Sequence, residues 1–287
     1  MKAWLTTVGL AAVLCLPTAS QAATRILFVG NSFTYGANSP AMHYKADTVH
    51  DLNSEGIGGV PALFKAFTRE AGLDYDVSLE TSGGKNFDFH YNTKLGLIDR
   101  PWDIVVMQGY STLDAKVPGD ATDLVKYAVM LANEFHKQNP QVQLWLDATW
   151  SRPDQTYPDG THWHGRPIEQ MALDVRKGYD QARAASPWFT GVLPVGEAFN
   201  LAIKEGVADP NPYDGIAFNQ LDLWAWDHYH ASGAGYYLEA LVEFGALTGK
   251  DPLSLGAHEP CAADMGLSPA QATALQTVAH DILARPS

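Results

Sequence analysis

Ser32 stands where a strongly apolar segment gives way to a polar turn, and its hydroxyl is the first candidate for chemistry in the sequence. The segment Arg25-Ile26-Leu27-Phe28-Val29 has the composition of a buried strand and runs directly into Gly30-Asn31-Ser32-Phe33-Thr34. A serine at this junction would be exposed and rigidly held, as a nucleophile has to be. A Gly-Asn-Ser turn is also an ordinary connection between a strand and a loop, so the turn alone does not identify a nucleophile.

A nucleophilic serine needs a general base, and the base needs a carboxylate to orient it. Asp227-His228-Tyr229-His230 offers both groups. A separation of three residues in a turn places Asp227 and His230 on one side, where the carboxylate can fix the imidazole tautomer and stabilise the imidazolium. His228 is the competing choice of base, and two surface histidines without a catalytic role are the simpler alternative.

Both segments resemble motifs of the SGNH (GDSL-like) hydrolases. Gly30-Asn31-Ser32-Phe33-Thr34 is similar to the family's first block, in which many relatives have Asp in place of Asn31. The continuation of the second segment, His230-Ala231-Ser232-Gly233-Ala234-Gly235, resembles the family's His-x-Ser-x-x-Gly ending and favours His230 over His228. The resemblance covers nearly the whole mature chain and implies a triad of Ser32, His230 and Asp227.

A weaker match implies one of the groups that hold the oxyanion. Thr81-Ser82-Gly83-Gly84-Lys85-Asn86 resembles the block whose glycine N–H contacts the oxyanion. The resemblance implies Gly84 as this glycine, with Gly83 as the alternative. A pair of glycines that serves only a turn is the competing interpretation.

The segment Val105-Val106-Met107-Gln108-Gly109-Tyr110-Ser111 stands where many relatives carry Gly-x-Asn, and it contains no asparagine. It is similar to the Gln-Gly-Glu variant of carbohydrate-acting relatives, with Tyr110 in place of Glu. The resemblance therefore implies an oxyanion hole formed by the N–H groups of Ser32 and Gly84 and the side-chain amide of Gln108. An amide donor of this kind can lower a barrier by roughly 3 kcal/mol.

Two further groups of residues invite a functional interpretation. His162-Trp163-His164 with Asp159 contains possible metal ligands, but the further ligands of a zinc site do not stand at recognisable positions, so we expect no metal and no other cofactor. Four tryptophans fall in or beside segments expected to surround the cleft: Trp150, Trp163, Trp224 and Trp226. Aromatic faces suit sugar rings, and Trp150 and Trp163 are the candidates for substrate binding; packing in the core is the alternative.

Short β-branched runs alternate with longer stretches of helical periodicity, a pattern typical of β-α-β units around a parallel sheet. Together with the resemblance, this predicts a three-layer α/β/α, flavodoxin-like fold with about five strands in one domain over residues 23–287. Strands are expected at residues 26–29, 77–80, 104–107, 142–146 and 191–193. Helices are expected at residues 60–71, 122–136, 168–185, 196–204, 233–247 and 269–283.

The composition narrows the class of protein further. The chain has 287 residues, of which 46% are hydrophobic and 18% charged, as in a folded globular protein. A formal net charge of -13 argues against nucleic acid as a partner.

The first 22 residues read as a secretory signal peptide. Met1-Lys2 precedes an apolar run up to Leu16, and Ala19-Ser20-Gln21-Ala22 supplies a cleavage site after Ala22. The apolar run is shorter than the roughly 20 residues that cross a bilayer, so we expect a periplasmic or secreted protein without stable membrane insertion. Cleavage would leave Cys261 as the only cysteine and thus no intramolecular disulfide.

These observations predict an exported serine esterase that removes short acyl groups, plausibly acetyl, from a carbohydrate or a cell-envelope glycan by two-step acyl transfer. A lipid esterase, a general short-chain esterase and an acyltransferase would use the same residues. A non-catalytic binding protein with the same fold is the third alternative, because the oxyanion asparagine is missing. The sequence does not define an oligomeric state.

Overall fold

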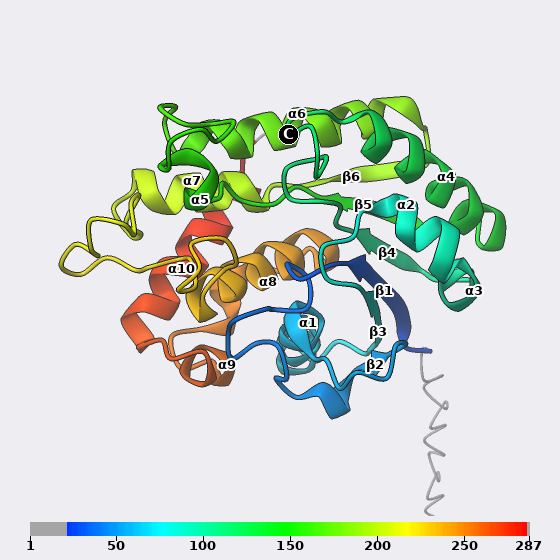
Figure 1. Ribbon diagram of the computed structural model, residues 1–287. Coiled ribbons are helices and arrows are strands. Elements are labelled where there is room, and N and C mark those ends of the chain that lie inside the picture. Colours follow the sequence, from blue (N-terminus) through cyan, green and yellow to red (C-terminus); the bar gives the residue numbers. More distant parts are fainter. Residues whose placement is uncertain (1–21, 286–287) are drawn as a thin grey trace, which may run out of the picture.

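Six parallel strands form the centre of the computed structural model, which describes residues 22–285 (Figure 1). Their order in the sheet is β2-β3-β1-β4-β5-β6, and every neighbouring pair is parallel. The strands span β1 Thr24–Gly30, β2 His50–Asp51, β3 Tyr75–Thr81, β4 Ile104–Met107, β5 Gln143–Asp147 and β6 Phe189–Leu193.

The predicted flavodoxin-like sheet is confirmed. The five predicted strands correspond to β1, β3, β4, β5 and β6, whose order in the sheet, counting these strands alone, is 2-1-3-4-5. The sixth strand, β2, has only two residues at the edge of the sheet. A segment this short has no hydrophobic period, and it was therefore not predicted.

Helices cover both faces of the sheet, as Figure 1 shows. The long helices match the six predicted segments closely: α1 Gly59–Glu70, α4 Thr122–Gln138, α6 Glu169–Ala185, α7 Val195–Lys204, α8 Gly233–Thr248 and α10 Pro269–Leu283. The short ones are η1 Ala46–Thr48, α2 Phe87–Phe89, η2 His90–Lys94, α3 Leu95–Ile98, α5 Pro153–Thr156, η3 Pro252–Leu255 and α9 Pro260–Asp264.

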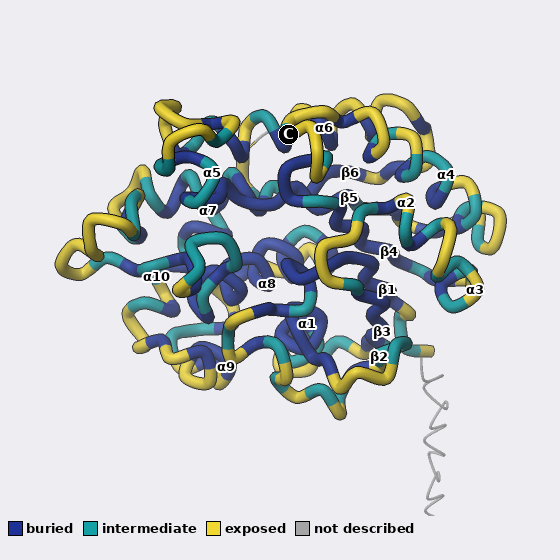
Figure 2. The backbone as a smooth tube through the Cα atoms, viewed as in Figure 1, coloured by how far each residue is buried: buried dark blue, intermediate teal, exposed yellow. Residues whose placement is uncertain are grey.

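The core consists of two apolar clusters, one on each face of the sheet, and Figure 2 shows much of the central strands and of α8 in the colour of buried residues. Alternate residues of β1 point to opposite faces: Ile26 and Phe28 pack with α1, α7, α8 and α10, whereas Leu27 and Val29 pack with α4 and α6. This alternation explains why β1 is apolar throughout, since a strand covered on both faces has no polar side.

Parallel strands place all their carboxyl ends at one edge of the sheet. The segments that follow β1, β3 and β4 therefore meet, and they carry the predicted Ser32, Gly84 and Gln108. The predicted signal peptide lies outside the described residues. Within residues 22–285, no helix combines the length and the apolar character needed to cross a membrane.

Three carboxyl groups are buried together between the sheet and α8. Asp147, at the end of β5, lies with Glu239 and Glu243 of α8, and an oxygen of each lies within 4.8 Å of the others. Both oxygens of Glu239, one of Glu243 and one of Asp147 have no hydrogen-bond partner among the described residues. Burial raises the pKa of Asp147 to about 7 and the pKa values of both glutamates well above 4.5.

This group makes stability depend on pH. Outside this group of three, Glu197 of α7 and Tyr179 of α6 are ionisable neighbours of Asp147, and Tyr236 is an ionisable neighbour of Glu239. Because the folded state holds these protons more tightly than the unfolded chain does, the free energy of unfolding falls as pH rises above about 4. For Asp147 the fall ends near pH 7, and a pKa raised from 3.8 to about 7 corresponds to a loss on the order of 4 kcal/mol.

We therefore predict that Asp147→Asn raises the free energy of unfolding at pH 8 by roughly 1–4 kcal/mol and flattens its dependence on pH between 4 and 8. Urea unfolding across this range measures both effects. Asp47→Asn, at an exposed carboxylate, is the matched control and should leave the pH dependence unchanged. A variant that is less stable than the parent at pH 8 would contradict the prediction.

Candidate active site

Ser32 lies in a tight turn directly after β1, and its residue is only 5% exposed. The backbone oxygen of Ser32 accepts hydrogen bonds from Ala37 N (3.0 Å) and from the hydroxyl of Tyr236 in α8 (3.2 Å). Gly30 is required at the start of this turn, because a Cβ there would lie 2.0 Å from Thr34 Oγ1. The turn is therefore closely packed and fixes the position of the serine.

Hydrogen bonds fasten the turn to the two neighbouring strands. Gln108, which directly follows β4, accepts at Oε1 from Asn31 N (3.0 Å) and Thr34 Oγ1 (3.1 Å). The side chain of Asn31 donates to Lys85 O (2.9 Å) and Gly109 O (3.0 Å). The side chain of Asn31 is thus bound to the segments after β3 and β4, and the side chain of Thr34 to the segment after β4.

The side chain of Gln108 is bound within the site. Its Nε2 donates to Gly109 O, and its Oε1 is fixed by the donors Asn31 N–H and Thr34 O–H. The amide is buried, and in this structure Gln108 positions the turn of Ser32, while the second N–H of Nε2 has no acceptor among the described residues.

Backbone N–H groups at the same edge of the sheet are free. Among the described residues, neither Ser32 N nor Gly84 N has an acceptor. Gly84 adopts a left-handed conformation (φ 67°), and the space where its Cβ would stand is open. These two N–H groups were the backbone donors predicted for the oxyanion.

Asp227 and His230 form a close pair, as predicted. His230 Nδ1 lies 2.6 Å from Asp227 Oδ2, and Asp227 Oδ1 accepts from the backbone N–H groups of Tyr229 (3.1 Å) and His230 (3.0 Å). Partial burial alone would raise the pKa of the Asp227 carboxyl, but the hydrogen bonds from His230 and the backbone outweigh it and hold this pKa below 3.8. The carboxylate is therefore charged and oriented towards Nδ1.

The second ring nitrogen of His230, Nε2, is left free by the described residues in this arrangement. His230 Nε2 is buried and has no hydrogen-bond partner among residues 22–285. The ring of Phe33, the residue after Ser32, has its centroid 5.7 Å from that of His230. The imidazole therefore lies beside the turn of Ser32, and among the described residues no hydrogen bond joins its Nε2 to Ser32 Oγ.

The residues after His230 explain the His-x-Ser-x-x-Gly pattern. Ser232 caps α8 by accepting from Gly235 N (3.3 Å), and its hydroxyl donates to Asp222 O (2.7 Å). A Cβ at Gly235 would lie 2.3 Å from Leu223 O. Both residues hold the start of α8 against the preceding loop, and the imidazole is placed two residues before this cap.

Asn38 is a site residue that the sequence did not reveal. Its Nδ2 donates to Asp227 Oδ2 (2.7 Å) and lies 3.4 Å from His230 Nδ1. Asn38 has a left-handed backbone (φ 60°), which asparagine tolerates better than most residues. It connects the loop after Ser32 directly to the carboxylate, and no local pattern indicates a contact across 189 positions.

His228 does not lie in the position of a base. Its backbone is left-handed (φ 53°), and its ring packs against Tyr213 with centroids 4.3 Å apart. No carboxylate lies within hydrogen-bond distance of its ring in the described part of the chain. The geometry therefore favours His230, as the motif predicts.

The two tryptophans predicted to bind substrate are buried, so this prediction is wrong. Trp150 stacks between Phe33 and Phe199, with centroids 4.3 Å and 4.9 Å away, and Trp163 donates to Asp174 Oδ2 (3.1 Å). Neither ring has a face open to a sugar. Trp226, next to Asp227, is instead 79% exposed.

The possible metal ligands lie on the surface. His164 Nε2 is 3.3 Å from Asp159 Oδ1, and both side chains are exposed. The ring of His162 packs on Trp163 with centroids 4.5 Å apart. The structure thus pairs one histidine with the aspartate and leaves the other on the tryptophan.

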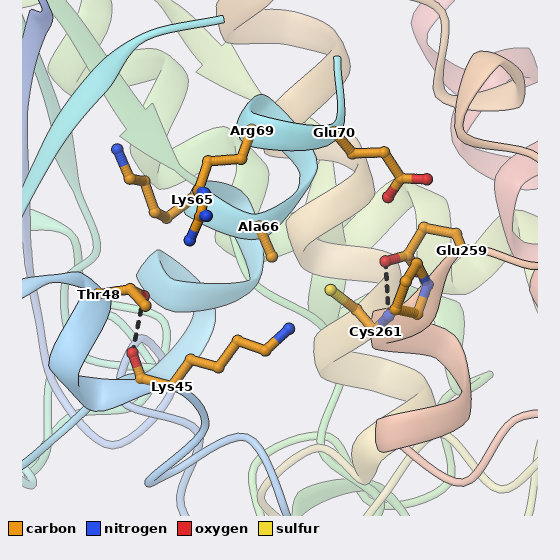
Figure 3. Close-up of a pocket in the computed structure, with 9 residues that line it drawn as sticks. Lys45, Thr48, Lys65, Ala66, Arg69, Glu70, Glu259 and Cys261 are labelled. Atoms are coloured by element: carbon orange, nitrogen blue, oxygen red, sulfur yellow. Dashed lines mark hydrogen bonds between the residues drawn. The ribbon is translucent and has the colours of Figure 1, made fainter. Parts of the chain in front are cut away.

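Of two cavities in the structure, only the first is lined by a residue of the predicted site, Gly84. A polar cavity of about 470 Å³ begins at Gly84 and includes Lys85, Asn86, Tyr110 and Lys116. A second cavity, of about 460 Å³, lies between η1, α1 and α9 (Figure 3). In Figure 3 its wall carries the charged side chains of Lys45, Lys65, Arg69, Glu70 and Glu259, and it contains none of the predicted catalytic residues.

Comparison with protein-family models gave no match, and comparison with curated protein sequences gave none either. Solved structures with the same fold were found. A DUF4886 family protein from Bacteroides uniformis has a TM-score of 0.56 at 17% identity, and the match covers 92% of this chain and 96% of that one.

Two further structures are similar. A protein from Slackia heliotrinireducens, provisionally described as an SGNH hydrolase, has a TM-score of 0.52 at 22% identity, covering 79% of this chain and all of that one. The enzyme LAE5, an alpha/beta hydrolase from the metagenome of Lake Arreo in Spain, has a TM-score of 0.53 at 18% identity, covering 80% and 97%. The chain therefore has the fold of the SGNH hydrolases.

We predict that Asn38→Ala lowers kcat/KM for an ester substrate about 5-fold, because Asp227 loses a donor that helps to orient it. Asn38→Gly keeps the left-handed backbone accessible and should show the same loss, which separates the amide from backbone strain. Asn219→Ala, at an exposed left-handed asparagine, is the matched control and should retain full activity. Equal activity of all three variants would show that Asn38 does not support the carboxylate.

Proposed function

We propose that the protein is an exported serine esterase of the SGNH type that removes short acyl groups, above all acetyl, from a carbohydrate or a cell-envelope glycan. One observation carries the proposal. His230 Nδ1 is bound to a charged carboxylate at 2.6 Å, while His230 Nε2 is buried and free beside the turn of Ser32. A general base that activates a serine needs this combination.

In the proposed reaction His230 Nε2 accepts the proton of the Ser32 hydroxyl as Ser32 Oγ attacks the ester carbonyl carbon. The tetrahedral intermediate collapses as His230 returns this proton to the leaving alcohol, and an acyl-serine remains. A water molecule, deprotonated by His230, then attacks the acyl-serine, and His230 returns this proton to Ser32 Oγ as the bond from Ser32 Oγ to the acyl carbon breaks and the acid is released. Asp227 keeps the proton on Nδ1 and stabilises the imidazolium in both steps.

Two backbone N–H groups are proposed to hold the oxyanion. Ser32 N and Gly84 N have no acceptor among the described residues, and each belongs to a segment that starts at the carboxyl end of a strand. Their position is fixed before the substrate arrives, because Asn31 ties Lys85 to the turn of Ser32. Preorganised donors of this kind lower the barrier without any rearrangement during the reaction.

The surroundings favour a small acyl group and a polar alcohol. Ser32 is almost fully buried, which leaves little room around the nucleophile. The cavity that begins at Gly84 has polar walls with lysine, asparagine and tyrosine side chains, which suit the hydroxyl groups of a sugar. Export follows from the signal peptide expected over the first 22 residues, and it would bring the enzyme to envelope or extracellular glycans.

A chromogenic acetyl ester tests the esterase. We expect measurable turnover by the purified protein, a loss of at least about 1,000-fold for Ser32→Ala and for His230→Ala, and covalent labelling of Ser32 by a fluorophosphonate. His228→Ala should stay within about 5-fold of the parent once folding has been checked by circular dichroism. Turnover that is equal in the parent and in Ser32→Ala would refute the proposal and favour a binding protein.

The length of the acyl chain separates an acetyl esterase from a lipid esterase. Because the space around Ser32 is confined, we expect kcat/KM to fall steadily from the acetyl to the octanoyl ester. A preference for the longer chains would exclude the proposed substrate. Accumulation of a transferred acetyl group on an added sugar would indicate a transferase.

A variant of Trp226 tests whether the substrate is a carbohydrate. Trp226 directly precedes Asp227 in the sequence and has an exposed ring that can stack on a sugar, so Trp226→Ala should raise KM for an acetylated oligosaccharide about 2- to 10-fold. The same variant should turn over a chromogenic acetyl ester at the parental rate. Trp188→Ala is the matched control, because Trp188 is partly exposed but directly precedes β6, at the opposite edge of the sheet. An unchanged KM in Trp226→Ala would remove this residue from the substrate site.

A further inference from the structure

A buried arginine lies close to the proposed base. Arg152 is only 7% exposed, and each nitrogen of its guanidinium donates a hydrogen bond. Nε and Nη2 donate to the two oxygens of Asp154, at 3.0 Å and 2.6 Å, and Nη1 donates to Ser111 Oγ at 3.0 Å. The plane of the guanidinium is therefore fixed.

The guanidinium, the Tyr229 ring and the His230 ring form a continuous stack. Arg152 Cζ lies 3.4 Å from the centroid of the Tyr229 ring. The centroid of the His230 ring lies 4.1 Å from the same centroid, with the two rings inclined by 28°. Two planar groups cannot occupy one face of a six-membered ring at these distances, so Arg152 and His230 lie on opposite faces of Tyr229.

The hydrogen bond to Asp227 does not prevent the imidazole ring from tilting. It fixes Nδ1, but it permits the ring to tilt about this atom, and a tilt moves Nε2. The face of Tyr229 restrains the tilt on one side, and the Phe33 ring, 5.7 Å away, lies near the imidazole as well. Tyr229 is itself held by Trp150, whose Nε1 donates to Tyr229 O (3.2 Å).

The charge of Arg152 is compensated within the stack. Asp154 binds the guanidinium with both oxygens, so the pair carries no net charge and offers no site for an anionic substrate. The backbone supports the same contact, because Asp154 N donates to His228 O (3.1 Å). The segment after β5 thus contacts the loop of the proposed base twice, through the Arg152 side chain on Tyr229 and through the main-chain bond from Asp154 to His228.

We propose that Arg152 and Tyr229 are positioning residues that orient the His230 imidazole, so that Nε2 is kept in place for the nucleophile. The proposal rests on the proposed function, since it assigns a role to the same base. Neither residue touches the reacting atoms. Their effect is on the geometry of proton transfer, where a displacement of about 1 Å can cost about 100-fold in rate.

The test compares variants that break the stack with variants that keep it. Arg152→Met and Tyr229→Leu should each lower kcat on a chromogenic acetyl ester about 10- to 100-fold while KM changes less than 3-fold. Tyr229→Phe retains the ring and should stay within about 3-fold of the parent. Arg166→Met, at an exposed arginine, is the matched control. The double variant Arg152→Met/Tyr229→Leu should lose no more than the worse single variant, because both remove one restraint.

A direct observation of the ring keeps the test independent of turnover. The NMR resonances of the His230 imidazole should shift and broaden in Arg152→Met and Tyr229→Leu but not in Tyr229→Phe. If the parent protein is inactive but its resonances respond in this way, the proposed esterase function is refuted, whereas the role of Arg152 and Tyr229 in orienting the His230 ring is retained. Unchanged resonances and unchanged kcat in Arg152→Met would overturn the proposal.

Arg152→Met leaves the partly buried Asp154 without its partner and can therefore fail to fold. Arg152→Met/Asp154→Asn removes this charge, and Tyr229→Leu leaves the ion pair in place. A folded protein with normal kcat in either of these variants would also overturn the proposal.

Discussion

The hydrogen bonds of Asn31 and Gln108 are the constraint on which the site depends. They fasten the turn after β1 to the segments that follow β3 and β4, and these segments carry the predicted oxyanion donor and the polar cavity. Because the contacts of Asn31 with Gln108 and Gly109 are buried, removal of one partner would leave an unpaired polar group in the core. The position of Ser32 is therefore a property of the whole carboxyl edge of the sheet.

Helix α8 links the other half of the site to the same edge. Its cap, Ser232, follows His230 closely, and its Tyr236 donates to the backbone oxygen of Ser32. The same helix carries Glu239 and Glu243 into a buried group with Asp147. The fold thus contains an unfavourable set of buried carboxyls in the contact between α8 and β5, on the same helix that contacts Ser32 and begins just after His230.

What the sequence predicted was local, and what it missed depends on distant contacts. The strands and long helices follow from hydrophobic period, the flavodoxin-like sheet from the resemblance to the SGNH hydrolases, and the Asp227–His230 pair from a short motif. The contact of Asn38 with Asp227 has no local signal. Trp150 stands next to a loop at the site, yet its ring turns into the core, and position along the chain does not specify this direction. Gln108 was assigned as a donor, but the donors of Asn31 and Thr34 decide which end of its amide faces the turn.

Strain around the site is consistent with this dependence on distant contacts. Asn38 and His228 have left-handed backbones although neither is glycine, and Leu113, a bulky residue, adopts the same conformation where it accepts from the side chain of Asn86. Such conformations persist only where the surroundings over-determine them. The imidazole of His230 is restrained in the same manner, by the Asp227 carboxylate at one atom and by the Tyr229 face over the ring. Asp227 and Tyr229 belong to the same short segment as His230, and each is held by a distant residue: Asn38, in the loop after Ser32, donates to Asp227, and Arg152, in the segment after β5, packs on Tyr229. The orientation of the imidazole therefore depends on all three segments.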